Sequence, residues 1–139
     1  MKANLLTFDP GKITGYSVWH NGTVLQAGGI VTMQEMLMIM QKWGFAHCCV
    51  YEGFARANAS TGDQLQAIEM CGAIQAVALL YGMKLVKQYP SQRVGYLPYA
   101  KNHAATLNIE RAYLTHAIDA IAHGLRYLDK EGFEWQMQP

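Results

Sequence analysis

The sequence predicts an α/β domain in which helices flank a five-stranded sheet. Short apolar runs, typical of buried strands, alternate with longer segments whose apolar residues recur at helical spacing. Two of the short runs end in an acid: Leu5–Phe8 is followed by Asp9, and 46–51 is followed by Glu52. Ligands of open α/β sheets bind beyond the carboxyl ends of the strands. If these two strands are parallel neighbours, both acids lie at that edge.

The composition is that of one globular domain. The chain has 139 residues, of which 51% are hydrophobic and 15% charged, which excludes a disordered chain. No apolar run reaches the roughly 20 residues that a membrane span needs, so we expect no membrane association. The net charge of +1 excludes a bulk basic nucleic-acid binder. With only ten acids, however, acids clustered in one cleft would leave the remaining surface basic.

The three cysteines, Cys48, Cys49 and Cys71, indicate a reducing compartment. Their number is odd, two are adjacent and none forms a C-x-x-C pair, which argues against a disulfide framework and a structural zinc. The first residues also lack the basic-then-apolar pattern of a signal peptide. We therefore expect an intracellular, cytoplasmic protein.

Local signals set the elements of the first half. Pro10-Gly11 predicts a turn after the first strand, and Asn21-Gly22 predicts a two-residue hairpin. Thr32 and Glu35 have the spacing of a capping box at a helix start. The expected elements are strand 5–8, strand 15–20, strand 23–30, helix 33–43 and strand 46–51.

The second half predicts two long helices around a fifth strand. The helix over 61–81, with Thr61 and Gln64 as a capping box, is apolar nearly all round. Such a helix is buried on two sides, one against the sheet and the other against a partner such as a second copy of the chain. The remaining elements are strand 83–89, a short helix and then a loop over 91–105, a helix that begins between 108 and 115 and ends near 130, and a tail over 133–139.

Asp9, Glu52 and Asp119 form the candidate chemical constellation. His116 precedes Asp119 by three residues and His123 follows it by four, so the three share one helix face. Clustered carboxylates repel each other unless a cation lies between them, and oxygen ligands favour Mg²⁺ or Mn²⁺. Two such ions about 4 Å apart activate water and stabilise the leaving oxygen of a phosphodiester. The alternatives are turn chemistry for Asp9 and Glu52, and a polar helix-start residue for His116.

The order of these motifs resembles the RuvC family of Holliday-junction resolvases, within the RNase H-like nucleases. Phe8-Asp9-Pro10-Gly11 with Thr14-Gly15-Tyr16 closely resembles that family's opening motif. The segment 51–54 resembles its acid-plus-aromatic segment, 55–78 its loop and dimerisation helix, and 116–120 its closing motif. The resemblance covers 3–128 and implies an RNase H-like fold with a five-stranded mixed sheet, a nuclease domain over 1–132.

The resemblance also implies an activity: a homodimer, paired through the helix around 61–81, that nicks four-way DNA junctions symmetrically. Two Mg²⁺ ions, with Mn²⁺ as a substitute, would be held by Asp9, Glu52, His116 and Asp119. Phe54 would stack on a base near the crossover or else simply pack in the core. The residues expected to contact DNA are Phe54, Arg56, Asn58, Arg93, Lys101 and Arg111.

The chain departs from the family after the fifth strand. Bacterial members carry a Val-Lys pair where this chain has Arg93-Val94-Gly95. We therefore expect the catalytic positive charge to come from elsewhere, from Lys101 or another residue. His123 is expected either at the surface or orienting a ligand or the attacking water. A compact, divergent member suggests a phage-type enzyme that acts in the cytoplasm of a host.

Three other functions compete with the resolvase. An actin-like ATPase also has an acid and a glycine after its first strand, but it needs two such domains, and 139 residues supply one. A second rival is another RNase H-like nuclease that acts on flaps, branched DNA or RNA–DNA hybrids. The third is a junction-binding module with a dead site. Magnesium-dependent cleavage discriminates among them.

Overall fold

A computed structural model describes residues 3–44, 46–53 and 62–133. It contains a mixed five-stranded sheet in the order β3-β2-β1-β4-β5, so the predicted fold class is confirmed. β1 pairs antiparallel with β2, which pairs antiparallel with β3, whereas β1–β4 and β4–β5 are parallel. The strands are β1 (Leu5–Asp9), β2 (Thr14–His20), β3 (Thr23–Ile30), β4 (Cys48–Glu52) and β5 (Lys84–Gln88).

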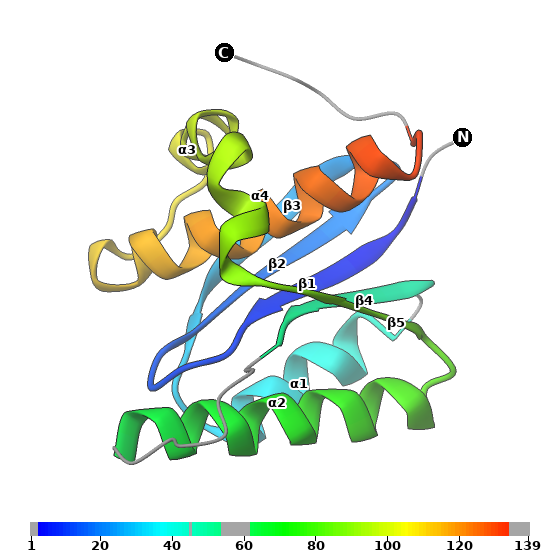
Figure 1. Cartoon of the computed structure of the whole chain (residues 1–139), viewed down its shortest axis with the longest axis vertical. Coiled ribbons are helices and arrows are strands. Elements are labelled where there is room, and N and C mark those ends of the chain that lie inside the picture. Colours follow the sequence, from blue (N-terminus) through cyan, green and yellow to red (C-terminus); the bar gives the residue numbers. More distant parts are fainter. Residues whose placement is uncertain (1–2, 45, 54–61, 134–139) are drawn as a thin grey trace.

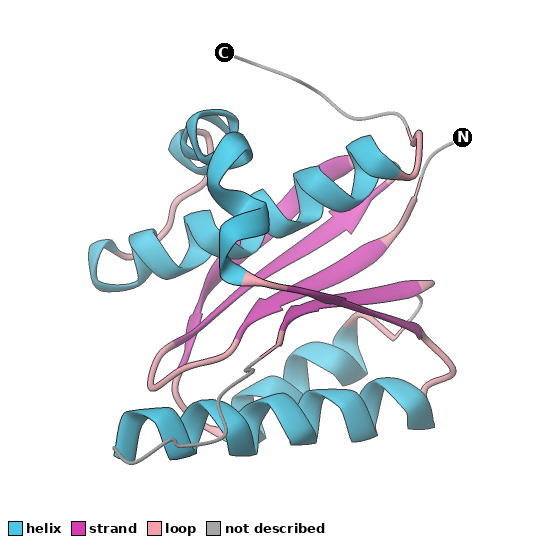
Figure 2. Ribbon diagram, viewed as in Figure 1, coloured by secondary structure: helices cyan, strands magenta, loops and turns pink. Residues whose placement is uncertain are grey.

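Helices cover both faces of the sheet (Figures 1 and 2). One layer holds α1 (Met33–Lys42) and α2 (Gly62–Leu80), and the other holds α3 (Leu97–Ala105) and α4 (Leu114–Lys130). Two short 3-10 helices, η1 (Pro90–Tyr96) and η2 (Arg111–Tyr113), precede α3 and α4. Among the described residues, no helix is long and apolar enough to cross a membrane.

The sheet separates two hydrophobic cores. Leu6 and Phe8 point into the core under α1 and α2, whereas Leu5 points into the core under α3 and α4. This division follows from the alternation of side chains along a strand. Both faces of β1 are buried, which explains why its sequence reads as a continuous apolar run.

Close contacts hold α4 against β1 and β2. A Cβ at Gly15 would lie 1.9 Å from the backbone oxygen of His116, so only glycine permits this approach. Gly124 leaves similar room for the indole of Trp19. The hydroxyl of Thr7 donates to the carbonyl of Ala120 at 2.7 Å. These contacts place the first turns of α4 beside the end of β1.

Several local predictions are confirmed. Asn21 and Gly22 both have positive φ, of 52° and 79°, as a two-residue hairpin requires. The capping box of Thr32 and Glu35 is present at the start of α1. Thr61, the expected cap of α2, lies outside the described residues. Phe133, which we assigned to the tail, stacks on Tyr127 with ring centroids 5.9 Å apart.

The prediction of a loop before Ala105 is wrong. The segment forms η1 and then α3, which runs to Ala105. Pro98 lies in the first turn of α3. The backbone N–H that proline lacks would have no partner within the helix at this position, so Pro98 helps to start the helix. Ala100 and Ala104 are buried against the core, and this tertiary packing outweighs the weak helical pattern of the sequence.

Candidate active site

Three neighbouring parallel strands end in polar side chains at one edge of the sheet. Phe8 pairs with Tyr51, so Asp9 and Glu52 leave the sheet side by side. Glu52 itself pairs with Gln88 at the end of β5. The predicted convergence of Asp9 and Glu52 therefore occurs, and Gln88 extends the row.

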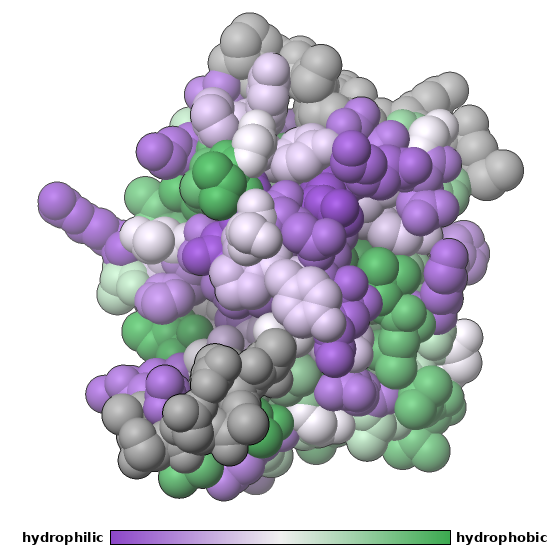
Figure 3. Space-filling view, in the orientation of Figure 1, coloured by the Kyte–Doolittle hydropathy of each residue, from purple (hydrophilic) through white to green (hydrophobic). Residues whose placement is uncertain are grey.

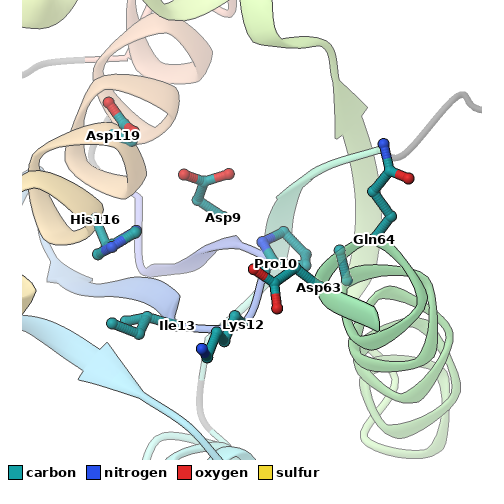
Figure 4. Close-up of a pocket in the computed structure, with 10 residues that line it drawn as sticks. Asp9, Pro10, Lys12, Ile13, Asp63, Gln64, His116 and Asp119 are labelled. Atoms are coloured by element: carbon teal, nitrogen blue, oxygen red, sulfur yellow. The ribbon is translucent and has the colours of Figure 1, made fainter. Parts of the chain in front are cut away.

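The start of α4 brings His116 and Asp119 to the same place. Together with Asp9, they line a cavity of about 500 Å³ (Figure 4). The cavity lies between the turn after β1, α2 and α4. In Figure 4 the side chains of Asp63 and Gln64 face this space from α2, and Lys12 lies at the turn. The lining residues are Asp9, Pro10, Gly11, Lys12, Ile13, Asp63, Gln64, Ala67, His116 and Asp119.

His123 joins Glu52 to Gln88 through a buried hydrogen-bonded row. Its Nε2 lies 2.9 Å from Oε1 of Glu52, and its Nδ1 lies 2.6 Å from Oε1 of Gln88. The amide nitrogen of Gln88 donates to the backbone oxygen of His123 at 3.2 Å, which turns the amide oxygen toward Nδ1. The ring is fully buried, which excludes a surface histidine. It therefore faces an acceptor with each nitrogen and fixes the Glu52 carboxylate.

Arg93 contacts the other side of the acidic cluster. Its Nη1 donates to Oε1 of Glu52, and its Nε lies 3.3 Å from Oδ1 of Asp119. η1 follows β5 directly and so carries the guanidinium across the strand ends. We expected this arginine to contact DNA phosphates. In the structure it forms an ion pair with each of two candidate metal ligands.

The electrostatics of Asp9 and Glu52 differ sharply. Burial, the adjacent Glu52 carboxylate and then Asp119 raise the pKa of Asp9 to about 9, against a smaller lowering by Arg93. Burial also acts to raise the pKa of Glu52, but hydrogen bonds with His123 and Asp9, and the charge of Arg93, outweigh it and lower that pKa. At neutral pH Asp9 therefore holds a proton, which it shares with an ionised Glu52.

The chemical types of the side chains at this edge are those that bind a hard divalent cation. Three carboxylates and one imidazole converge on a single edge of the sheet, and Asp9 gains a proton where a cation would relieve the repulsion. Within the described part of the chain, no three such groups stand close enough to share one ion as they are arranged. The guanidinium of Arg93 lies between two of them.

The other predicted DNA contacts are more scattered. Phe54, Arg56 and Asn58 lie outside the described residues. Lys101 is exposed on α3 and Arg111 is exposed on η2, and neither is among the residues that line the cavity. The described residues thus place Arg93, not Lys101, against the acids.

Four site residues were missed from the sequence: Lys12, Asp63, Gln64 and Gln88. Gln88 had a usable signal, since it ends a strand just as Asp9 and Glu52 do. Lys12 and Asp63 are exposed, and no sequence pattern separates them from ordinary solvated residues. Their place at the cavity depends on how the turn and α2 pack together.

Comparison with known proteins agrees with this architecture. No protein-family model and no curated protein matches the sequence. The mixed five-stranded sheet with helices on both faces is a RuvC-like fold of the α/β class. A structure of Thermus thermophilus RuvC in complex with Holliday junction substrate has a TM-score of 0.67 at 15% identity, covering 94% of this chain and 96% of that one. A second Thermus thermophilus RuvC structure has a TM-score of 0.59 at 19% identity, covering 94% and 97%.

Proposed function

We propose that this protein is a metal-dependent endonuclease that resolves four-way DNA junctions. The observation that supports this most is the meeting of Asp9, Glu52 and Asp119 at one edge of the sheet within a RuvC-like fold. The solved neighbour with the higher TM-score holds a Holliday junction substrate. Hydrolysis adds water across a phosphodiester bond, leaving a phosphate on one strand end and a hydroxyl on the other.

Asp9, Glu52, His116 and Asp119 are the residues that would hold two Mg²⁺ ions, with Mn²⁺ as a substitute. Such ions lower the pKa of water and stabilise the charge on the departing oxygen. The chain's own residues prepare the site. His123 and Gln88 hold the Glu52 carboxylate in one orientation, and Gly15 lets the His116 turn of α4 approach β2.

Among the described lysines, Lys12 is the one that lines the cavity and could hold a DNA phosphate beside the acids. It lies in the turn after β1, is exposed and lines the same cavity as Asp9 and Asp119. A flexible ammonium group at the mouth of an acidic cavity offsets the repulsion between the acids and the DNA backbone. Lys101 remains a proposed phosphate contact of the outer surface.

The exposed outer face of α2 supports a homodimer. Its inner face is buried against the sheet, including Met70 and Ile74. Its outer face exposes Leu65, Ile68 and Leu79, with Leu79 65% exposed, at spacings that form one stripe. Figure 3 shows hydrophobic surface at the lower right, over the carboxyl end of α2. A second copy of this chain pairing along the stripe would give two active sites for paired, symmetric nicks.

Phe54 remains the proposed residue that stacks on a base near the crossover. It lies outside the described residues, but Glu52 and Gly53 lead directly into its segment. We also propose an intracellular place of action, as a phage-type enzyme in the host cytoplasm. The three cysteines, all free and buried, support a reducing compartment.

Cleavage of a synthetic immobile four-way junction in Mg²⁺ tests the proposal. A duplex, a branched flap and an RNA–DNA hybrid serve as competing substrates. Paired symmetric nicks on the junction are the expected result. Preferred cleavage of the flap or the hybrid would move the chain to another RNase H-like nuclease activity.

One observation favours a second candidate, a junction-binding module without activity. Arg93 already forms ion pairs with both Glu52 and Asp119 in this structure, where a permanent substitute for a metal ion would lie. Tight junction binding without cleavage in either Mg²⁺ or Mn²⁺ would establish that reading instead.

A further inference from the structure

The guanidinium of Arg93 bridges two acids that belong to different elements. Nη1 donates to Oε1 of Glu52, at the end of β4, while Nε lies 3.3 Å from Oδ1 of Asp119, on α4. The side chain is only 24% exposed. Arginine usually binds one carboxylate with two nitrogens of its fork. Here it divides its donors and ties the sheet edge to the last helix.

The acids need such a counter-charge. Glu52 and Asp119 lie beside Asp9 at a largely buried edge, and like charges there repel strongly. Arginine keeps its charge at any physiological pH, so this cation is always available. The chain therefore carries its own positive charge where the donor set would otherwise attract a metal ion.

We propose that Arg93 is a built-in counter-cation that competes with divalent ions for Glu52 and Asp119, and that it moves to a DNA phosphate when they bind. This inference rests on the proposed function. A divalent ion and the guanidinium need the same oxygen lone pairs, and two cations so close together repel each other. The displaced guanidinium has the planar fork that suits a phosphate.

The exchange couples the metal to the DNA. If metal binding frees Arg93 for a phosphate, a bound junction favours the metal, and a bound metal favours the junction. Linkage requires the two effects to be equal in free energy. Free protein would then hold divalent ions weakly, and the junction complex would hold them well. As a result, divalent ions would fill the site mainly in protein molecules that have bound the DNA junction.

Mn²⁺ binding to the DNA-free protein tests the competition directly. Calorimetric titration would compare the wild type with Arg93→Gln, Arg93→Lys and Lys87→Gln. We expect Arg93→Gln to bind Mn²⁺ on the order of tenfold more tightly, since no ion pair must then be broken. Arg93→Lys should fall between, because an ammonium lacks the fork that reaches both acids. Lys87→Gln removes an exposed charge of β5 that stacks on Tyr89 and should change the affinity less than twofold.

Junction affinity measured in EDTA and in Ca²⁺ tests the coupling. We expect Ca²⁺ to tighten junction binding by the wild type several-fold more than it tightens binding by Arg93→Gln. The same gels report any cleaved product, which ensures that the measured affinity is that for the intact junction.

The outcomes separate this inference from the proposed function. Unchanged or weaker Mn²⁺ binding by both Arg93 variants would overturn the competition, while junction cleavage by the wild type would still support the nuclease. Equal Ca²⁺ effects in wild type and Arg93→Gln would overturn the coupling. If neither the wild type nor the variants bound Mn²⁺ in a manner abolished by Asp9→Asn, both this inference and the metal site of the proposed function would fail.

Discussion

Nε2 of His123 lies 2.9 Å from Oε1 of Glu52, and this contact joins α4 to the end of β4 at the acidic cluster. The same ring reaches Gln88 with its other nitrogen. Three elements are thus joined behind the Glu52 carboxylate, whose pKa is lowered. The candidate site is held in place by the residues that would touch metal or DNA and also by this buried row behind them.

His123→Ala tests this positioning role. Removing a fully buried ring leaves a cavity and leaves the side-chain oxygen of Gln88 without its hydrogen-bond partner. We therefore expect the free energy of unfolding to fall by about 2–4 kcal/mol. We also expect the junction cleavage rate per folded molecule to fall at least about tenfold, because Glu52 loses its fixed orientation. Denaturant unfolding and single-turnover cleavage measure the two effects.

His103→Ala is the matched control. His103 is also buried, but it lies on α3 against the ring of Trp19, with centroids 6.1 Å apart. This variant should lose stability and keep its cleavage rate per folded molecule. Equal losses of rate in the two variants would mean that His123 acts only through stability.

Asp9→Asn separates chemistry from binding. The Asp9 carboxylate is expected to hold metal, so its replacement by the amide of asparagine should abolish cleavage. Junction affinity should stay within about threefold of the wild type. Electrophoretic mobility shift and cleavage assays on the same junction provide the measurement. Loss of binding together with cleavage would make Asp9 a structural residue.

The same variant tests the pH dependence of the metal-free protein. The pKa of Asp9 is raised from 3.8 to about 9 on folding, so the folded state binds the proton more tightly than the unfolded state. Stability from this group is present below pH 3.8 and is lost as the pH rises toward 9. Asp9→Asn should therefore flatten the decline in melting temperature between pH 4 and pH 9. An unchanged slope would show that Asp9 is not the group responsible.

Gly15→Ala tests how α4 is seated. The added Cβ would overlap the backbone oxygen of His116, at 1.9 Å, and the helix must shift to relieve it. We expect a loss of about 3 kcal/mol or more, and weaker metal binding because His116 and Asp119 move with the helix. Gly95→Ala adds the same atom where the described residues leave open space, and it should change stability by less than about 0.5 kcal/mol.

Strand-end chemistry explains how much of this site is predictable. Asp9 and Glu52 follow apolar runs, so the rule for parallel strands predicts from the sequence that they lie together. Asp119 was predicted because it shares a helix face with His116 and His123 in an otherwise apolar helix. The position of Arg93 could not be predicted, because η1 has no periodic pattern and its direction depends on how β5 leaves the sheet. The helical state of 97–105 likewise depends on the burial of Ala100 and Ala104 against the core.

Lys12→Ala tests the proposed phosphate contact at the cavity. Because Lys12 is an exposed charge beside the acids, its loss should weaken junction binding about three- to tenfold and reduce the slope of log affinity against log salt by about one. Lys130→Ala removes a charge at the opposite end of α4 and should leave both quantities nearly unchanged. An identical salt slope in wild type and Lys12→Ala would rule out the contact.

Leu79→Glu tests the dimer. Leu79 lies in the exposed apolar stripe of α2, and a carboxylate buried there without a partner would cost several kcal/mol in each copy. We expect the variant to be monomeric by sedimentation at micromolar concentration where the wild type is dimeric, with its melting temperature as a monomer preserved. Met38→Glu, an equally exposed position on α1, is the control and should leave the dimer intact.

Because each copy supplies one acidic cluster, the Leu79→Glu monomer should nick one strand at most per binding event, and paired nicks should disappear before single nicks do. Paired nicking by a proven monomer would show that the two cuts do not require two copies of the chain.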